Sequence, residues 1–149
     1  MRQGLAGWRA IGAEFARPYC LAMLAEAYAQ NGQAEEGLAV VAEALAAVET
    51  TGERFYEAEL HRLRGELLLP SPSQRTAAAA CFQQALDIAR RQQAKSWELR
   101  AAMSLARLWQ QQGKRDVARE LLAPIYGWFT EGFDTTDLQE AKALIEELA

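Results

Sequence analysis

The chain has 149 residues, half of them hydrophobic, and a formal net charge of −4 at neutral pH. This length suits one domain with a substantial apolar core, and the acidic balance argues against a nucleic-acid partner. No apolar run reaches the about 18 residues that a membrane-spanning helix requires, so we expect no membrane partner. Charged residues interrupt the first apolar positions and leave no secretory-signal pattern. We therefore expect a cytoplasmic protein.

Helix is the secondary structure that the composition favours. Alanine is frequent and proline is scarce, and alanine has the best helix propensity while proline disrupts helix interiors. No stretch alternates β-branched and polar residues as a half-buried strand does. Apolar residues instead recur at spacings of three and four, which marks one face of a helix. The sequence predicts an all-α fold with helices over residues 3–16, 18–30, 34–49, 53–69, 74–93, 96–112, 115–129 and 137–148.

Glycine and proline mark the predicted connections. Gly32 and Gly113 follow two helical segments, and glycine readily adopts the left-handed conformation that ends many helices. Gly52 and Gly132 interrupt the pattern at two further places. The segment 70–73 reads Pro-Ser-Pro-Ser and is the clearest loop of the chain.

Small residues recur along the chain at a regular interval. Positions 25, 65 and 106 carry Ala, Gly and Ala, so the intervals are 40 and 41 residues. A large residue follows each of them three positions later. This repetition indicates stacked helix pairs whose backbones approach closely at small side chains. We expect such crossings at Ala25, Ala44, Gly65, Ala85, Ala106 and Ala118.

Two runs of residues resemble the tetratricopeptide repeat. The first is Leu24-Ala25, Tyr28, Gly32, Gly37, Val41, Ala44, and the second is Leu105-Ala106, Trp109, Gly113, Ala118, Leu122, Ile125. The middle repeat has Arg64 where the family has leucine. The resemblance implies a right-handed superhelix of antiparallel helix hairpins that forms one domain over residues 1–149. Its expected parts are a partial repeat at 3–16, hairpins at 18–51, 53–93 and 95–130, and a capping helix at 134–148.

A more specific resemblance covers essentially the whole chain, and its wording is most specific in the second half. The chain is similar to the C-terminal repeat region of bacterial signalling proteins that join a class III nucleotide cyclase, a predicted ATPase and a long helical tail. The similar segments are GERFYEAELHRLRGELLL, CFQQALDIARRQQAKSWELRAAMSLARLW and LLAPIYGWFTEGFDTTDLQEAKALIEEL. This resemblance implies a scaffold or sensor segment for signal transduction that binds a protein or peptide. It brings no catalytic motif with it.

The sequence offers no catalytic or metal-binding pattern. It lacks the glycine-rich phosphate-binding motifs and the serine-hydrolase motif. The single histidine, His61, falls at a helix-packing position and has no partner suited to catalysis. Cys20 and Cys81 have neither disulfide-framework nor metal-ligand spacing, so we expect packed thiols. We therefore expect a protein that is not an enzyme and holds no cofactor or metal.

The tetratricopeptide resemblance implies a concave groove lined by the first helix of each hairpin. Its side chains carry both charges, which suits an extended peptide or a helix; a solvated face without a ligand is the other interpretation. A small-molecule effector held in the same face is the alternative function. The groove positions are Tyr19, Glu26, Gln30, Glu59, Arg62, Glu66, Arg100, Met103, Arg107 and Gln111.

The two ends of the repeat array differ. The last predicted helix has a polar outer face, as a capping helix should. The first has an apolar face that no preceding helix covers, formed by Leu5, Trp8, Ile11 and Phe15. Two-fold pairing is the commonest way for a soluble protein to bury such a face, so we expect a homodimer through it. Trp128, near the other end, suits either the core or an interface.

Overall fold

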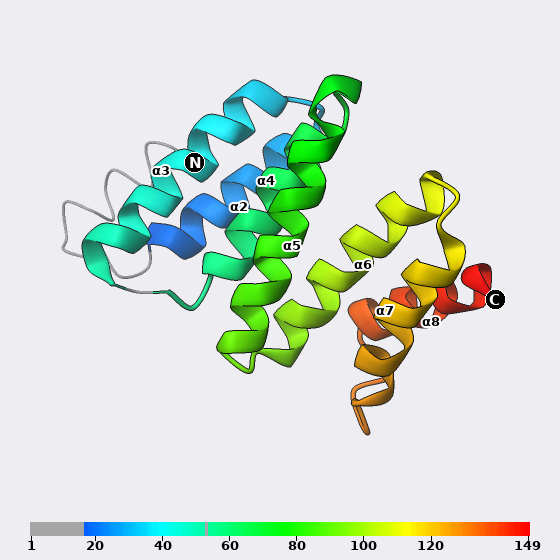
Figure 1. Ribbon diagram of the computed structural model, residues 1–149. Coiled ribbons are helices and arrows are strands. Elements are labelled where there is room, and N and C mark those ends of the chain that lie inside the picture. The colour runs from blue at the N-terminus through cyan, green and yellow to red at the C-terminus, as the bar shows by residue number, and fades with distance from the viewer. Residues whose placement is uncertain (1–16, 53) are drawn as a thin grey trace. The chain divides into compact units, whose positions relative to one another are not determined.

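The computed structural model describes residues 17–52 and 54–149. These ranges contain seven α-helices and no strand, which confirms the all-α prediction (Figure 1). The predicted helix 3–16 lies outside the described residues, and so do the expected dimer residues Leu5, Trp8, Ile11 and Phe15. The helices are α2 Arg17–Gln30, α3 Ala34–Thr51, α4 Glu57–Leu68, α5 Arg75–Arg91, α6 Lys95–Gln111, α7 Arg115–Gly127 and α8 Thr136–Leu148.

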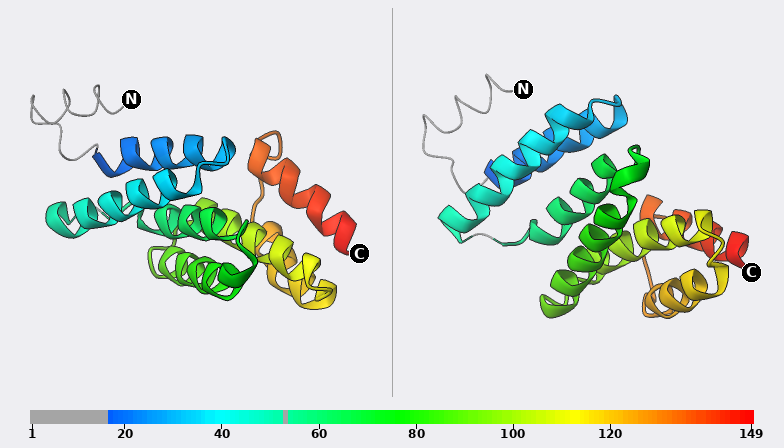
Figure 2. Two further views of the ribbon diagram at one scale, coloured as in Figure 1. Left: turned by 90° about the horizontal axis from the view of Figure 1, so that it is seen from above. Right: turned by 45° about the horizontal axis from the view of Figure 1, so that its top comes forward.

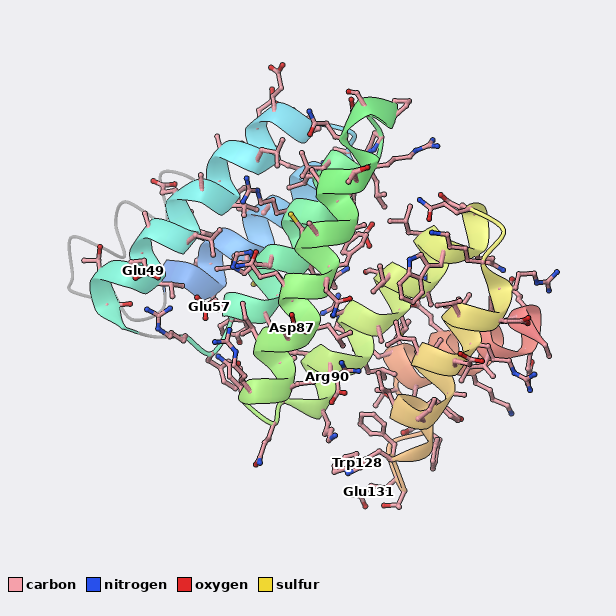
Figure 3. All side chains as sticks on the ribbon, viewed as in Figure 1. Glu49, Glu57, Asp87, Arg90, Trp128 and Glu131 are labelled. Carbon is pink, nitrogen blue, oxygen red and sulfur yellow. The ribbon has the colours of Figure 1, made fainter. Side chains whose placement is uncertain are left out.

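The start of α4 differs most from the prediction. A helix was expected from residue 53, but Phe55 and Tyr56 form a turn and α4 begins at Glu57. The guanidinium of Arg54 bridges this connection, because its Nη1 lies 3.2 Å from Oε1 of Glu49 and 2.8 Å from Oε2 of Glu57 (Figure 3 labels the two glutamates). The charged bridge therefore links the last turn of α3 to the first turn of α4.

The chain divides into two compact units, residues 1–81 and 82–149, with the boundary inside α5. In the first unit, α2 and α3 lie side by side and α4 packs against both (Figures 1 and 2). The predicted crossing residues Ala25 and Ala44 are completely buried there. The single domain and its right-handed superhelix stay predictions. The core of this unit comprises Leu21, Ala22, Leu24, Ala25, Val40, Val41, Ala44, Val48, Leu60, Leu63 and Leu67.

In the second unit, α6 pairs with α7, and α8 packs against both. The C-terminal half of α5 contributes Ala85 and Leu86 to the same core. Ala85, Ala106 and Ala118 are completely buried, as their predicted place at helix crossings requires. The apolar face of α8 is buried while its other face is exposed, so this final helix covers the pair that precedes it. The buried residues of α8 are Leu138, Ala141, Leu144 and Leu148.

The same turn closes α2 and α6. After α2, the N–H of Gly32 donates to the carbonyl of Ala29 at 3.3 Å, and the next N–H donates to the carbonyl of Tyr28 at 2.9 Å. The equivalent bonds after α6 run from Gly113 to Gln110 and from the next residue to Trp109. This pair of bonds is the Schellman motif, which needs a left-handed residue. The φ angles of Gly32 and Gly113 are 72° and 79°, which confirms their predicted role.

A third copy of this turn closes α5 without a glycine. The N–H of Gln93 donates to the carbonyl of Arg90 at 3.1 Å, and that of Ala94 donates to Ala89 at 2.9 Å. Gln93 adopts a φ of 55° and is the one non-glycine residue with a positive φ among the described residues. A glutamine does not predict a positive φ angle. The two hydrogen bonds of the Schellman motif require a left-handed residue at this position.

Gly37 marks the closest approach of α3 to its neighbours. A Cβ atom placed on Gly37 would lie 2.5 Å from Cδ2 of Leu67 and 3.3 Å from Cβ of Tyr28. Real Cβ contacts are longer than the first of these distances. Leu67 is only 3% exposed, so it has little room to move aside. The absence of a side chain at Gly37 therefore lets α2, α3 and α4 pack together.

We expect Gly37→Ala to be less stable than Gly127→Ala by about 1–3 kcal/mol, the usual effect of overpacking. Gly127 is also helical, but a Cβ atom there would have nothing within 4 Å. Alanine has the better helix propensity in a helix interior, where Gly37 lies, so a loss of stability there comes from the steric effect. Urea unfolding of the two variants measures it. Equal unfolding free energies would show that Gly37 is not a close crossing.

Candidate functional site

Three predicted groove residues on α4 form a buried ion-pair cluster instead. The guanidinium of Arg62 donates to Glu59 through Nε at 2.9 Å and through Nη2 at 2.7 Å. Its Nη1 lies 3.5 Å from Oε1 of Glu66. Glu59 and Arg62 are only 5% and 8% exposed, so the prediction that they line an open groove is wrong. Spacings of three and four on one helix bring these charges together, and their pairing allows their burial.

The charge of Arg62 is held by its neighbours. Burial alone would lower the pKa of Arg62, but the hydrogen bond and charge of Glu59, followed by the charges of Glu66 and Glu26, raise it. Glu26 belongs to α2 and is half-buried, so this member of the predicted set does face α4. Removing one partner from a buried pair costs roughly 3–5 kcal/mol, because the other charge remains buried. The cluster therefore contributes to the packing of the first unit.

Tyr19 is the predicted groove residue of α2 that stays on the surface, together with Gln30 at the helix end. Tyr19 is 43% exposed, and its ring centroid lies 5.0 Å from that of Tyr56. Phe55, 58% exposed, packs edge-on against Tyr56 at 4.9 Å. Phe55 and Tyr56 were not predicted as surface residues, because the sequence pattern placed both inside a helix. The signal that could have indicated a surface aromatic pair was the occurrence of two adjacent aromatic residues shortly after Gly52.

In the second unit, α8 covers the face of α6 that was expected to bind a ligand. Nε of Arg100 lies 3.8 Å from Oδ1 of Asp137, and Nη2 of Arg107 lies 3.4 Å from Oε2 of Glu140. Met103 is 2% exposed and belongs to the core, so its prediction as a groove residue is wrong. The apolar face of α8 packs on this side of α6. The flexible apolar side chain of Met103 fills the interior of the core that the two helices share.

A polar pocket remains beside these ion pairs. Its volume is about 420 Å³, and it lies between α6 and α8. Two predicted groove residues, Arg107 and Gln111, line it and can donate hydrogen bonds to an acceptor. The complete lining is Arg107, Gln110, Gln111, Glu140, Ala143, Leu144 and Glu147.

His61 is a buried side chain of α4. It is 7% exposed, and its Nδ1 has no hydrogen-bond partner among the described residues. Burial lowers the pKa of His61; the charge of Glu57 opposes this shift and that of Arg64 reinforces it. The lowered pKa favours the neutral imidazole, and the burial of His61 confirms its predicted packing position.

Both cysteines are free thiols, as expected. Cys81 is buried, and burial raises the pKa of its thiol, which favours the unreactive protonated form. Cys20 is half-buried. Within residues 17–52 and 54–149, no three potential ligands cluster in a way that could hold a metal ion. None of the helices described is long and apolar enough to span a membrane.

An aromatic surface lies where α7 connects to α8. We call it the Trp128–Phe133 surface and define it as Lys95, Trp128, Phe129 and Phe133. Trp128 and Phe133 are 57% and 46% exposed, so the alternative that placed Trp128 in the core is excluded (Figure 3 labels Trp128). Phe129 meets the Trp128 ring edge-on at 5.2 Å. Nζ of Lys95 lies 5.3 Å from the centroid of the indole, within range of a cation–π interaction.

Further charges hold Lys95 in place. Its Nζ also lies 3.2 Å from Oε1 of Glu98, which is 5% exposed. Nε of Arg90 donates to the other carboxylate oxygen of Glu98, also at 3.2 Å. The buried carboxylate of Glu98 therefore orients Lys95, whose Nζ lies over the exposed Trp128 ring.

A small pocket adjoins this surface. Its volume is about 240 Å³, and it opens between the first turn of α6 and the first turn of α8. Leu99, Phe129 and Leu138 give it apolar walls, while hydroxyl and carboxylate groups line its rim. The complete lining is Ser96, Leu99, Phe129, Glu131, Gly132, Thr135, Asp137 and Leu138. Such a pocket has room for one apolar side chain of a partner.

Comparison with known proteins shows that the chain is similar to a segment of a longer protein. No family model matches it. A protein of Rhizobium meliloti (strain 1021), described as uncharacterized, is 35% identical over 107 residues. The match covers 72% of this chain and 10% of that protein. The chain thus corresponds to about a tenth of the length of the curated relative that it matches.

His61 should make stability depend on pH. Its folded pKa lies below the ordinary value of 6.5, so the unfolded chain binds more protons between these two values. This contribution is complete above about pH 6.5 and is lost as the pH falls towards the folded pKa. We expect His61→Leu to weaken the decline in unfolding free energy between about pH 7.5 and 5.5. Urea unfolding of both proteins at the two pH values measures this decline. An identical decline in the wild type and the variant would contradict a lowered pKa of His61.

Proposed function

We propose that the chain is a protein-interaction module of a larger bacterial signalling protein, within which it acts as a non-catalytic scaffold or regulatory segment. The observation that carries this proposal is the Trp128–Phe133 surface. The exposed Trp128 ring packs edge-on against Phe129, and Phe129 also lines a pocket with apolar walls. Tryptophan, tyrosine and arginine dominate the binding energy of protein interfaces, and grouped exposed apolar side chains commonly mark interaction sites.

The arrangement of this surface favours binding. Phe129 packs against one edge of the Trp128 ring, and Lys95 lies over it. A side chain that is already held in place loses less conformational freedom when a partner binds, which improves affinity. The adjacent pocket can take an apolar side chain of the partner, and its polar rim can fix the partner's orientation.

Two further observations support a module of this kind. The similar segment in the Rhizobium meliloti protein occupies a tenth of that protein's length, as a module within a long chain would. The helices pair in chain order, α2 with α3 and α6 with α7, as in repeat proteins that present extended binding surfaces. The cyclase–ATPase resemblance of the chain points to a bacterial signalling protein as the host.

The alternative function, sensing of a small-molecule effector, has its own supporting observation. The polar pocket between α6 and α8 has about 420 Å³, which is within the usual range of about 300–1,000 Å³ for small-molecule sites. Arg107 and Gln111 line it, and both belong to the set predicted to bind on the concave face. A polar metabolite with acceptor groups is the ligand that these donors would suit.

We expect Trp128→Ala to weaken capture of the partner at least ten-fold while changing stability little. Truncation of an interface hot spot costs about 2 kcal/mol or more, whereas surface changes usually alter stability by about 0.5 kcal/mol or less. The measurement uses the immobilised chain in a lysate of the organism that encodes it, with quantitative mass spectrometry of retained proteins and small molecules.

The matched control is Val117→Ala on α7. Val117 is 47% exposed, similar to Phe133, but it lines neither pocket. The proposal is supported if one lysate protein is retained by the Val117→Ala variant and is retained less by the Trp128→Ala variant. Retention that is indifferent to Trp128 contradicts it. A retained small molecule that is lost in Arg107→Ala and Gln111→Ala would support the sensor function instead.

A further inference from the structure

A further hollow lies on the first unit, between α3 and α4. We call it the α3–α4 groove, and its volume is about 430 Å³. The predicted concave-face residues do not line it, and the second helix of the first hairpin provides most of its wall. Its lining residues are Leu38, Val41, Ala42 and Leu45 of α3 together with Arg64 and Leu68 of α4.

The α3 side of the groove is an apolar stripe. Leu38, Val41, Ala42 and Leu45 follow the spacing i, i+3, i+4, i+7, so they share one helix face over about two turns. Val41 is buried at 1% exposure and forms the floor, while Leu38 and Leu45 are half-buried and Ala42 is exposed. The groove therefore presents a continuous apolar surface to whatever occupies it.

Arg64 places a positive charge beside this stripe. It stands where the tetratricopeptide pattern has leucine, and its side chain is exposed. Arg64 makes no hydrogen bond or ion pair with any residue that the structure describes, whereas Arg54 and Arg62 of the same unit are both paired with glutamates. The other lining residues are all uncharged. The groove thus has one cationic group without a counter-charge among the described residues.

We infer that the α3–α4 groove binds an amphipathic helix of a protein partner, with the apolar face of that helix on the α3 stripe and a carboxylate of it paired to Arg64. This inference rests on the proposed interaction function and names the kind of partner. A helix bound in a groove uses anchors at the same i, i+3, i+4, i+7 spacing that the stripe displays. An acidic side chain on the partner helix would supply the negative counter-charge for Arg64. A bidentate arginine–carboxylate pair also fixes the relative orientation of the two groups.

The shape favours a helix over a small amphiphilic acid. Small-molecule sites usually bury roughly 70–90% of their ligand. Here Arg64 and Ala42 at the groove are exposed, and Leu38, Leu45 and Leu68 are only half-buried. A helix can cover such an open surface along its length, whereas a small ligand would leave much of its own surface in water.

The test uses a photo-crosslinking amino acid in place of Ala42 in the full chain, expressed in the organism that encodes it. The expected adduct is a segment of another protein with apolar residues at spacings of three and four and a nearby Asp or Glu. Arg64→Glu should lower its yield at least ten-fold, and Arg64→Lys should lower it less, because lysine keeps the charge but not the bidentate geometry. The matched control carries the crosslinker in place of Ala39, another exposed alanine of α3 that does not line the groove.

A charge exchange completes the test. Calorimetric titration with a synthetic peptide of the captured segment should show binding to the wild type and at least ten-fold weaker binding to Arg64→Glu. Replacing the acidic residue of the peptide by lysine should restore binding to that variant. Thermal melting followed by circular dichroism verifies that Arg64→Glu is folded, which we expect because Arg64 is exposed.

The inference is overturned if no adduct forms, if the adduct is a fatty acid or a second copy of this chain, or if its yield is unchanged in Arg64→Glu. Failure of the charge exchange would also overturn it. The proposed scaffold function is tested separately at Trp128, which belongs to the other unit. Capture that depends on Trp128 but not on Arg64 would therefore remove this inference and leave the interaction function standing.

Discussion

Close approach of helix backbones at small side chains is the constraint on which both units depend. Ala25 and Ala44 in the first unit, and Ala106 and Ala118 in the second, are completely buried. Gly37 shows how tight the contact is, because even a Cβ atom there would overlap a neighbouring leucine. Protein interiors are packed as densely as organic crystals, so a larger residue at any of these positions would separate the helices.

Buried charges are tolerated in both units because each is paired. Arg62 is bound by Glu59 through two hydrogen bonds, and the buried Glu98 is neutralised by Arg90 and Lys95. An isolated charge in such positions would be several kcal/mol less favourable than in water. These pairs therefore belong to the packing of the helices. The Glu98 pairs also have a consequence at the surface, because they hold the lysine that contacts Trp128.

The surfaces best suited to a partner lie where no helix of the same unit covers them. In the second unit, α8 packs on the side of α6 that a repeat protein would use as its concave face. The exposed aromatic residues lie instead at the connection between α7 and α8. In the first unit, the outer face of α3 stays apolar beside Arg64. Both surfaces combine apolar side chains with one basic residue, Lys95 at Trp128 and Arg64 at the α3–α4 groove.

The sequence by itself determined the local structure of this protein. Period-3.6 patterns located seven described helices, Gly32 and Gly113 marked two of their ends, and the recurring alanines marked buried positions, because each of these signals acts within a few residues along the chain. Only the tertiary structure decided which of the predicted binding side chains are buried. Met103, Glu59 and Arg62 were predicted as groove residues but are buried, and Trp128, which suited either the core or an interface, is exposed. The pattern of one helix gives its faces but not the neighbour that covers each face. That choice depends on contacts between residues distant in sequence, as when α8 covers α6.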